Sequence, residues 1–261
     1  MKLKKLGQQG FTLVEIAIVL VILGFVLGAL LLPLQAQRQQ IAQVQTENTL
    51  EIAKQALLGF AQSNGRLPCP ATAASSGLEA PLGGNVLCTS QLGYLPAATL
   101  GVQPTDANGF AIDAWNNRIM YAVAQNSTTS VPANTATPDY TTNNATDGMN
   151  IVGLANLAPE LRVCNTSTGV TAAACSGGAE TNYLINNAVV VIYSTGATGA
   201  QASGGVDENV NPKIPSLPAT SKSVFVSHDI VSGSVNEFDH IVTWISPYVL
   251  YNSMIQAGQL H

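Results

Sequence analysis

The chain has 261 residues, a formal net charge of -5 and 46% hydrophobic residues, so it is long and apolar enough to bury a sizeable core. Beyond the N-terminus, representative basic residues stand singly: Lys54, Arg66, Arg118, Arg162, Lys213 and Lys222. Because a nucleic-acid interface needs clustered positive charge, this pattern argues against a nucleic-acid-binding protein.

The N-terminus combines a short leader with a long apolar run. Residues 1–10 end in Gly10, and Phe11 opens a hydrophobic segment that continues to residue 34 and contains one charged residue, Glu15. A carboxylate at membrane depth costs about 3 kcal/mol unless a partner neutralises it. The simplest partner is a free α-amino group on Phe11, which exists only after cleavage behind Gly10.

The sequence GFTLVE, with Gly10, Phe11 and Glu15 in this spacing, resembles the N-terminus of type IV pilins and type II secretion pseudopilins. The resemblance covers residues 1–65. It implies that prepilin peptidase cleaves after Gly10 and N-methylates Phe11, and that Glu15 guides assembly into a helical filament. The implied partners are other pilin or pseudopilin subunits, the peptidase and the inner-membrane assembly platform.

Two other interpretations of residues 11–34 are weaker. A secretory signal peptide has an apolar region of about 7–15 residues and ends at a small-residue site, whereas this run is longer and lacks such a site. A plain signal anchor gives no reason for Glu15 to follow the Gly10-Phe11 junction so closely.

The charges around the apolar run predict its orientation. Lys2, Lys4 and Lys5 precede the run, and no comparable basic cluster follows it. By the positive-inside rule, the N-terminus is cytoplasmic and everything after residue 35 is periplasmic. We therefore expect a single-pass inner-membrane protein that later enters a pilus or pseudopilus filament.

The helix is predicted to extend beyond the apolar run, from Phe11 to Asn64. Residues 35–64 carry an apolar stripe with helical spacing that suits packing on a head domain; its members are Ile41, Val44, Ala53, Ala56, Leu57 and Phe60. Pro33 should kink or locally open the helix, because proline removes one backbone hydrogen bond and clashes with the preceding turn. The pair Asn64-Gly65 is typical of the C-terminal cap of a helix.

The four cysteines are Cys69, Cys88, Cys164 and Cys175. They form no C-x-x-C pair and lie far from the histidines, so disulfides in an oxidising periplasm are favoured over a zinc site. Three connectivities are possible. We favour Cys69–Cys88 with Cys164–Cys175, which closes the shortest loops.

Residues 65–261 are predicted to form a β-rich head. The expected strands are the segment carrying Ile119, Tyr121 and Val123, the β-branched run at 187–194, and residues 223–226 and 238–245. Residues 125–150, rich in Asn and Thr, are expected to form an exposed loop. Ser246-Pro247 should start a short C-terminal helix that ends at Gly258, with Val249, Leu250 and Ile255 on compatible faces.

Asp113-Ala114-Trp115-Asn116-Asn117, followed by an aromatic-bearing strand, resembles the D-x-W-G-N-x-x-x-Y motif of pilin and pseudopilin heads. Asn116 stands where the motif has glycine. This departure puts the turn geometry in doubt and leaves the strand prediction intact. The C-terminal block NEFDHIVTWISPYVLYNSMIQAGQL resembles large minor pilin-like subunits.

The sequence gives little support for catalysis. His228-Asp229 and Asp239-His240 are adjacent pairs, but neighbouring residues on a strand point to opposite faces. No G-x-S-x-G nucleophile motif occurs. We therefore expect a protein that is not an enzyme.

Calcium is the one cofactor for which the sequence offers candidate ligands. Two sets of oxygen-bearing residues are candidates: Asp106, Asn108 and Asp113, or Asp207, Glu208 and Asn209. Neither set matches the 12-residue calcium loop, and turn formation explains both, so we expect no metal and no cofactor.

These observations predict an α+β pilin fold, a long N-terminal hydrophobic helix packed against an antiparallel β-sheet head. The expected parts are a leader at 1–10, a membrane and assembly half-helix at 11–34, an amphipathic half-helix at 35–64 and the head at 65–261. The expected function is a structural subunit of a type IV pilus, a minor pilin or pilin-like protein. The alternatives are a type II secretion pseudopilin and an adhesin head mounted on a pilus.

Overall fold

A computed structural model describes residues 12–83, 87–125, 139–145, 147–172, 174–175, 182–201, 204–213, 223–233 and 236–261, with backbone alone for 29–36. The chain divides into two compact units, Met1–Val44 and Gln45–His261. The four parts predicted from the sequence have other boundaries and stay a prediction. The fold combines helices with a largely antiparallel sheet, which places it in the α+β class.

The N-terminal helix, α1, runs from Leu13 to Asn64. It ends as the Asn64-Gly65 pair predicts, because Gly65 has φ of 68° and its N–H donates to the Ala61 carbonyl at 2.8 Å. The side chains of residues 29–36, and with them the predicted kink at Pro33, lie outside the described residues.

The larger sheet of the second unit has four strands: β1 Leu92–Tyr94, β2 Met120–Val123, β5 Val190–Ser194 and β7 Ile241–Ile245. Their order is β1-β2-β5-β7, and every neighbouring pair is antiparallel. All residues of β2 and β5 are buried, whereas alternation was expected in β2. A strand covered on both faces shows no period of two.

A smaller sheet has three strands: β3 Leu161–Cys164, β4 Tyr183–Ala188 and β6 Val224–Val226. Their order is β4-β3-β6, and the β3–β6 pair is parallel. The expectation of one continuous strand at 187–194 is therefore wrong. The run breaks at Val189, so that β4 joins the small sheet and β5 the large one. Apolar content predicted the strands, but hydrogen-bond partners decided where one ends.

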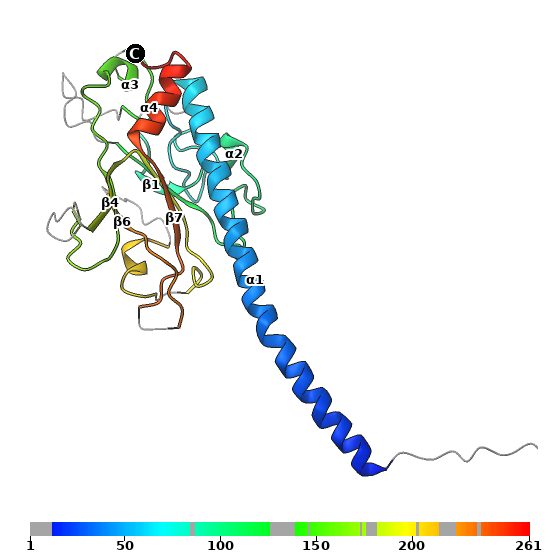
Figure 1. Ribbon diagram of the computed structural model, residues 1–261. Helices are drawn as coiled ribbons and strands as arrows, with labels where there is room; N and C mark the ends of the chain where they lie inside the picture. The colour runs from blue at the N-terminus through cyan, green and yellow to red at the C-terminus, as the bar shows by residue number, and fades with distance from the viewer. Residues whose placement is uncertain are drawn as a thin grey trace, which may run out of the picture. The chain divides into compact units, whose positions relative to one another are not determined.

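Short helices complete the second unit: α2 Ala97–Leu100, α3 Met149–Val152, the 3-10 helix η3 Glu208–Val210 and α4 Pro247–Gln256. Helix α4 begins as predicted, with the Ser246 side chain accepting from the Val249 N–H. Its buried face carries Leu250 and Met254, whereas Val249 and Ile255 are exposed. Figure 1 shows α4 beside the last turns of α1, where Gln62 Nε2 donates to Ser253 Oγ at 2.7 Å.

The core of the second unit includes the C-terminal part of α1. Leu50, Ala53, Leu57 and Ala61 are buried in one cluster with both central strands of the large sheet. Their spacing of three, four and four residues keeps them on one face. Ile41 and Val44, which were predicted for the same stripe, are exposed. The buried apolar stripe therefore begins at Leu50, about two and a half helical turns after the predicted start at Ile41.

Candidate functional site

The first described turn of α1 holds the predicted assembly residue in a capping box. Glu15 N–H donates to Thr12 Oγ1 at 3.3 Å, and Glu15 Oε2 accepts from Thr12 N–H and Oγ1 at 3.0 Å each. Each residue thus satisfies an N-terminal group that the helix leaves unpaired. A role for Thr12 was not predicted from the sequence, although the T-x-x-E spacing of Thr12 and Glu15 is the usual sign of a capping box. Gly10 and Phe11 lie outside the described residues.

The helix after this box is apolar around its whole circumference. Twelve large hydrophobic side chains between Leu13 and Leu27 are 48–86% exposed. A helix with a single apolar face would leave polar residues on the other side, and this one has none between Ile16 and Leu27. Over the part of the chain that the structure describes, no helix reaches the length and hydropathy needed to cross a membrane.

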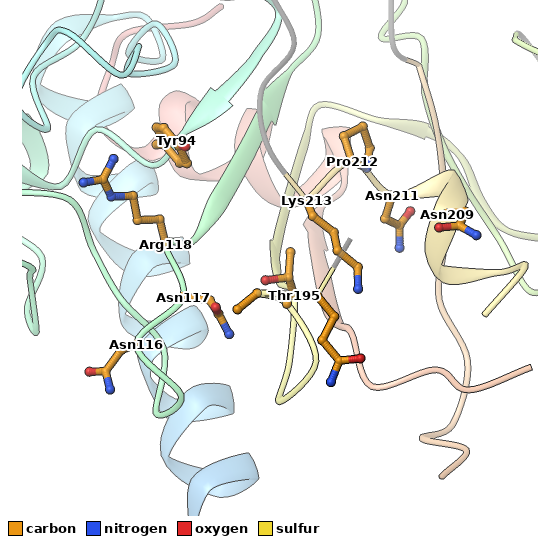
Figure 2. A pocket seen from close by; sticks show the side chains of 12 residues that line it. Tyr94, Asn116, Asn117, Arg118, Thr195, Asn209, Asn211, Pro212 and Lys213 are labelled. Carbon is orange, nitrogen blue, oxygen red and sulfur yellow. The ribbon is translucent and has the colours of Figure 1, made fainter. Parts of the chain in front are cut away.

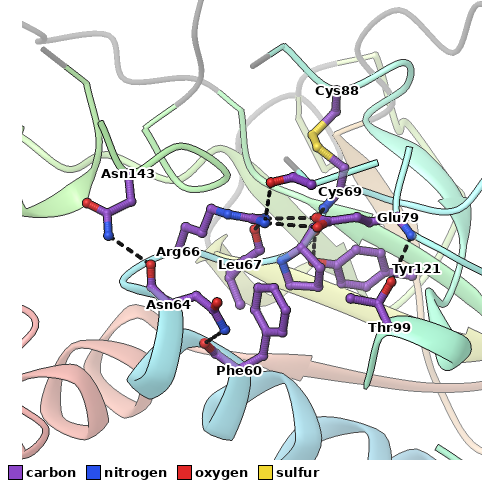
Figure 3. Close-up of polar contacts among 12 residues, drawn as sticks. Phe60, Asn64, Arg66, Leu67, Cys69, Glu79, Cys88, Thr99, Tyr121 and Asn143 are labelled. Atoms are coloured by element: carbon purple, nitrogen blue, oxygen red, sulfur yellow. Dashed lines mark hydrogen bonds and ion pairs between the residues drawn. A yellow bond between two sulfur atoms is a disulfide. The ribbon is translucent and has the colours of Figure 1, made fainter. Parts of the chain in front are cut away.

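The chain that leaves α1 is fixed by a buried ion pair (Figure 3). Arg66 donates from Nη1 to Glu79 Oε2 at 2.8 Å and from Nη2 to Glu79 Oε1 at 2.9 Å, and both side chains are buried. The guanidinium also donates to the carbonyls of Leu67 and Gly83 and lies 5.1 Å from the Phe60 ring centroid. A paired, hydrogen-bonded geometry of this kind is what makes a buried charge tolerable.

Glu79 joins the ion pair to the first disulfide. Its Oε2 accepts from the Cys69 N–H at 3.2 Å, and Cys69 is bonded to Cys88 with a Cα–Cα distance of 5.4 Å. The second disulfide joins Cys164 to Cys175, with Cα atoms 5.6 Å apart. The structure therefore has the pairing that closes the shortest loops. Both bonds tie a loop to the core, which indicates a structural role.

The turn before β2 is built around Asp113. Its Oδ1 accepts from the N–H groups of Trp115 and Asn117 at 2.9 and 2.8 Å, and its Oδ2 accepts from Ser194 Oγ at 2.6 Å. Burial raises the pKa of this carboxyl, and the hydrogen bonds partly offset that effect. Asn116 has φ of 66°, the left-handed conformation that glycine would adopt. Asparagine tolerates the left-handed region, so the turn forms with Asn116 in place of the glycine of the motif.

A cavity of about 750 Å³ lies beside this turn (Figure 2). Its walls come from three segments: the turn at 116–118, the loop at 195–201 and residues 209–213. The lining is rich in amides, with Asn116, Asn117, Gln201, Asn209 and Asn211, and it includes Tyr94, Arg118 and Lys213. Amide groups that both donate and accept, beside an aromatic ring, suit a hydroxyl-rich ligand. No sequence pattern indicated this cavity, because its walls are far apart along the chain.

The first calcium candidate set has protein partners for its carboxylates. Asp106 Oδ1 accepts from the N–H groups of Asn108 and Phe110, and its Oδ2 accepts from Arg118 Nε at 2.7 Å. Burial acts to raise the pKa of Asp106, but these hydrogen bonds and the Arg118 charge lower it overall. Both carboxylate oxygens of Asp113 accept hydrogen bonds from the turn and from Ser194. Both carboxylates therefore have the turn-forming role that the sequence favoured.

The two His-Asp pairs do not form catalytic dyads between neighbours. His228 Nε2 lies 3.1 Å from Asp207 Oδ2, and its Nδ1 contacts the Asp229 carbonyl at 2.7 Å. His240 is stacked beside Tyr193 and buried, which lowers its pKa to about 4 and keeps the imidazole neutral at neutral pH. Tertiary structure brings Glu208 to the Asp239-His240 pair. Burial, with the nearby Asp239, raises the pKa of Glu208.

Residues 5–31 match the family model described as the prokaryotic N-terminal methylation motif, the signature of type IV pilins and pseudopilins. The motif supports a pilin-like or pseudopilin subunit, processed by prepilin peptidase and assembled with other subunits. It also indicates a membrane-anchored protein of a pilus. No curated protein matches the chain, and no solved structure matches it.

Proposed function

We propose that this chain is a structural subunit of a type IV pilus, a minor pilin-like protein that assembles through its N-terminal helix and has no catalytic role. The observation that carries the proposal is the methylation motif at residues 5–31, with Glu15 as the acidic residue of the apolar run. The exposed apolar side chains from Leu13 to Leu27 support it, because they need a partner outside the chain. Lipid supplies that partner before assembly, and helices of other subunits supply it afterwards.

The capping box supports a role for Glu15 both before and after cleavage of the leader. In the uncut chain, Thr12 donates two hydrogen bonds to the carboxylate, so Glu15 Oε2 is not left without hydrogen-bond donors. Cleavage after Gly10 creates an amine on Phe11. In the low dielectric of a helix bundle, the amine of a neighbouring subunit attracts this carboxylate strongly.

Replacement of Glu15 tests the assembly role. Glu15→Leu should reduce incorporation into filaments at least tenfold, measured by quantitative immunoblotting of sheared filaments, while the amount in the membrane stays unchanged. The matched control is Glu51→Leu, because Glu51 is an acidic residue farther along α1 with an exposed ion pair to Lys54. Filament incorporation of the Glu15→Leu protein at the level of the Glu51→Leu protein would contradict the proposal.

Processing is tested separately at Gly10. Gly10→Leu should leave the leader attached, which intact-protein mass spectrometry detects as an unshifted and unmethylated chain. A processed Gly10→Leu chain would show that the peptidase does not cut at this junction.

The location of the protein distinguishes a pilus subunit from a secretion pseudopilin. Immunogold electron microscopy of the epitope-tagged protein should label surface filaments at the tip or along the shaft. Label confined to the periplasm would favour the type II secretion pseudopilin instead.

The cavity beside the Asp113 turn favours a second candidate function, an adhesin head that recognises a glycan. Its amide-rich lining is the supporting observation. Gln201→Ala and Asn209→Ala should abolish binding of piliated cells to a glycan array with piliation unchanged. Gln55→Ala, an exposed amide on α1, is the control. Equal binding by all three variants would remove this candidate.

A further inference from the structure

Three buried side chains from two distant parts of the chain meet in the head. Glu208 belongs to η3, and Asp239 and His240 precede β7. Their exposed fractions are 0%, 9% and 2%. One potential ligand atom from each residue lies within 4.8 Å of those of the other two.

Each of these residues has one polar atom held by the protein. Glu208 Oε1 accepts from the Asp239 N–H at 2.9 Å, and Asp239 Oδ2 accepts from the Thr198 N–H at 2.6 Å. His240 Nδ1 lies 3.3 Å from Asn211 Nδ2. The Asn211 amide is itself fixed, because it accepts from the Val226 N–H and donates to the Val226 carbonyl. The three side chains are therefore oriented by their surroundings.

The second polar atom of each residue has no hydrogen-bond partner among the described residues. These atoms are Glu208 Oε2, Asp239 Oδ1 and His240 Nε2, and all three are buried. Buried polar atoms in native proteins are nearly always paired with protein, water or an ion. Three such atoms on residues whose ligand atoms lie this close together indicate a ligand that the three residues share.

Lys213 neutralises this cluster only in part. Its Nζ lies 3.3 Å from Glu208 Oε2, without hydrogen-bond geometry, and donates to the Thr198 carbonyl at 3.2 Å. One ammonium offsets one of the two carboxylates. A cation beside Asp239 and His240 would offset the other carboxylate and contact the three atoms that have no hydrogen-bond partner.

We propose that Glu208, Asp239 and His240 bind a divalent transition-metal ion, with Zn²⁺ as the occupant. Two carboxylate oxygens and one imidazole nitrogen are ligands that Zn²⁺ accepts, whereas Ca²⁺ and Mg²⁺ select oxygen ligands. Asn211 engages Nδ1 and leaves Nε2 as the nitrogen available to the ion. The cysteines do not compete, because all four are in disulfides.

The ion would join η3 to the start of β7 and so fix one wall of the cavity. Asn209, Asn211 and Lys213 line the cavity and lie within five residues of Glu208. A fourth coordination position would be left for water, as in sites with three protein ligands. The proposal does not depend on the pilus function, because it concerns the head alone.

The test is zinc binding by the full chain, purified in detergent and stripped with a chelator. Isothermal titration calorimetry should show one Zn²⁺ per chain with micromolar or tighter affinity, and elemental analysis after dialysis should give the same ratio. His240→Gln and Asp239→Asn should each weaken binding at least tenfold. His228→Gln and His261→Gln are matched controls that remove an imidazole outside the cluster and should bind as the wild type does.

Binding of Co²⁺ to the wild-type chain tests the proposal even if the variants fail to fold. The wild-type chain with Co²⁺ should develop visible absorption bands that stoichiometric Zn²⁺ abolishes, which requires no substitution. Absence of these bands, absence of zinc binding, or unchanged affinity in folded His240→Gln would overturn the proposal. One Ca²⁺ per chain with no response to Zn²⁺ would also overturn it.

Discussion

Residues 13–27 and the second compact unit, Gln45–His261, called the head from here on, use apolar side chains in opposite ways. In the first region, large side chains such as Leu13 and Phe25 are 86% and 77% exposed, and the side-chain hydrogen bonds found among the described residues there are those of the Thr12–Glu15 capping box. In the head, a core joins α1 to the sheet, and disulfides and a buried ion pair fix the loops. The head supplies its own partners, whereas the N-terminal region needs them from lipid or other subunits.

The change occurs within a single helix. Ile41 and Val44 are exposed, and Leu50, Ala53 and Leu57 are buried. Both stretches belong to one continuous helix, so the difference in exposure lies in what each turn contacts. A subunit whose head is stable by itself can keep that fold while its N-terminal segment exchanges lipid for neighbouring helices.

The largest effect on stability is expected from a substitution that removes the buried ion pair of the head. Glu79→Gln leaves the Arg66 guanidinium buried without its charge partner and should lower the free energy of unfolding by about 3–5 kcal/mol. Urea unfolding of the detergent-solubilised chain, followed by tryptophan fluorescence, measures this, because Trp115 and Trp244 both lie in the head. Glu51→Gln removes an exposed ion pair and should change stability by less than about 0.5 kcal/mol. Equal effects of the two substitutions would contradict the distinction.

A pair of truncations on α1 sharpens the comparison. Leu57→Ala creates a cavity in the core and should lower the free energy of unfolding of the head by about 2–5 kcal/mol. Ile41→Ala removes a side chain that is 66% exposed and should change it by less than about 0.5 kcal/mol. The same fluorescence titration measures both. If Ile41→Ala destabilised the head as much as Leu57→Ala, the core would have to begin earlier on the helix.

A smaller effect is expected at the Asp113 turn. Asn116→Val places a β-branched residue at φ of 66° and should lower the free energy of unfolding by about 1–3 kcal/mol. Asn116→Gly relieves that conformation and should stay close to wild type. Thermal unfolding of the two variants side by side measures the difference. Equal melting temperatures would show that the left-handed conformation is not maintained in solution.

The smallest effect belongs to the N-terminal region. Thr12→Ala removes the capping hydroxyl and should destabilise the first turn of α1 by about 0.5–1 kcal/mol, with the head unchanged. Hydrogen exchange of the Glu15 and Ile16 amides, which donate to Thr12, should accelerate about threefold, as this free energy implies. Thr12→Ser keeps the hydroxyl and is the control. Unchanged exchange in Thr12→Ala would show that Glu15 is held by something other than this box.

The sequence predicted local features well. The end of α1 at Asn64-Gly65, the start of α4 at Ser246 and the strands near Tyr121 and Phe225 follow from caps, proline and apolar content. It failed at Val189, where the chain passes from one sheet to another inside a uniform β-branched run. It also placed the start of the buried apolar stripe of α1 about two and a half turns too early, at Ile41 in place of Leu50. Both errors concern long-range contacts, which local residue patterns do not encode.

Local residue patterns were enough to predict the processing junction, the motif around Glu15, the α+β class and the type of most elements, because these depend on residues close together in the chain. Long-range packing sets which part of α1 is buried, how the sheets divide, and that Glu208 lies beside Asp239 and His240. About thirty residues separate Glu208 from that pair, so packing of the core, and no spacing rule, brings these side chains together.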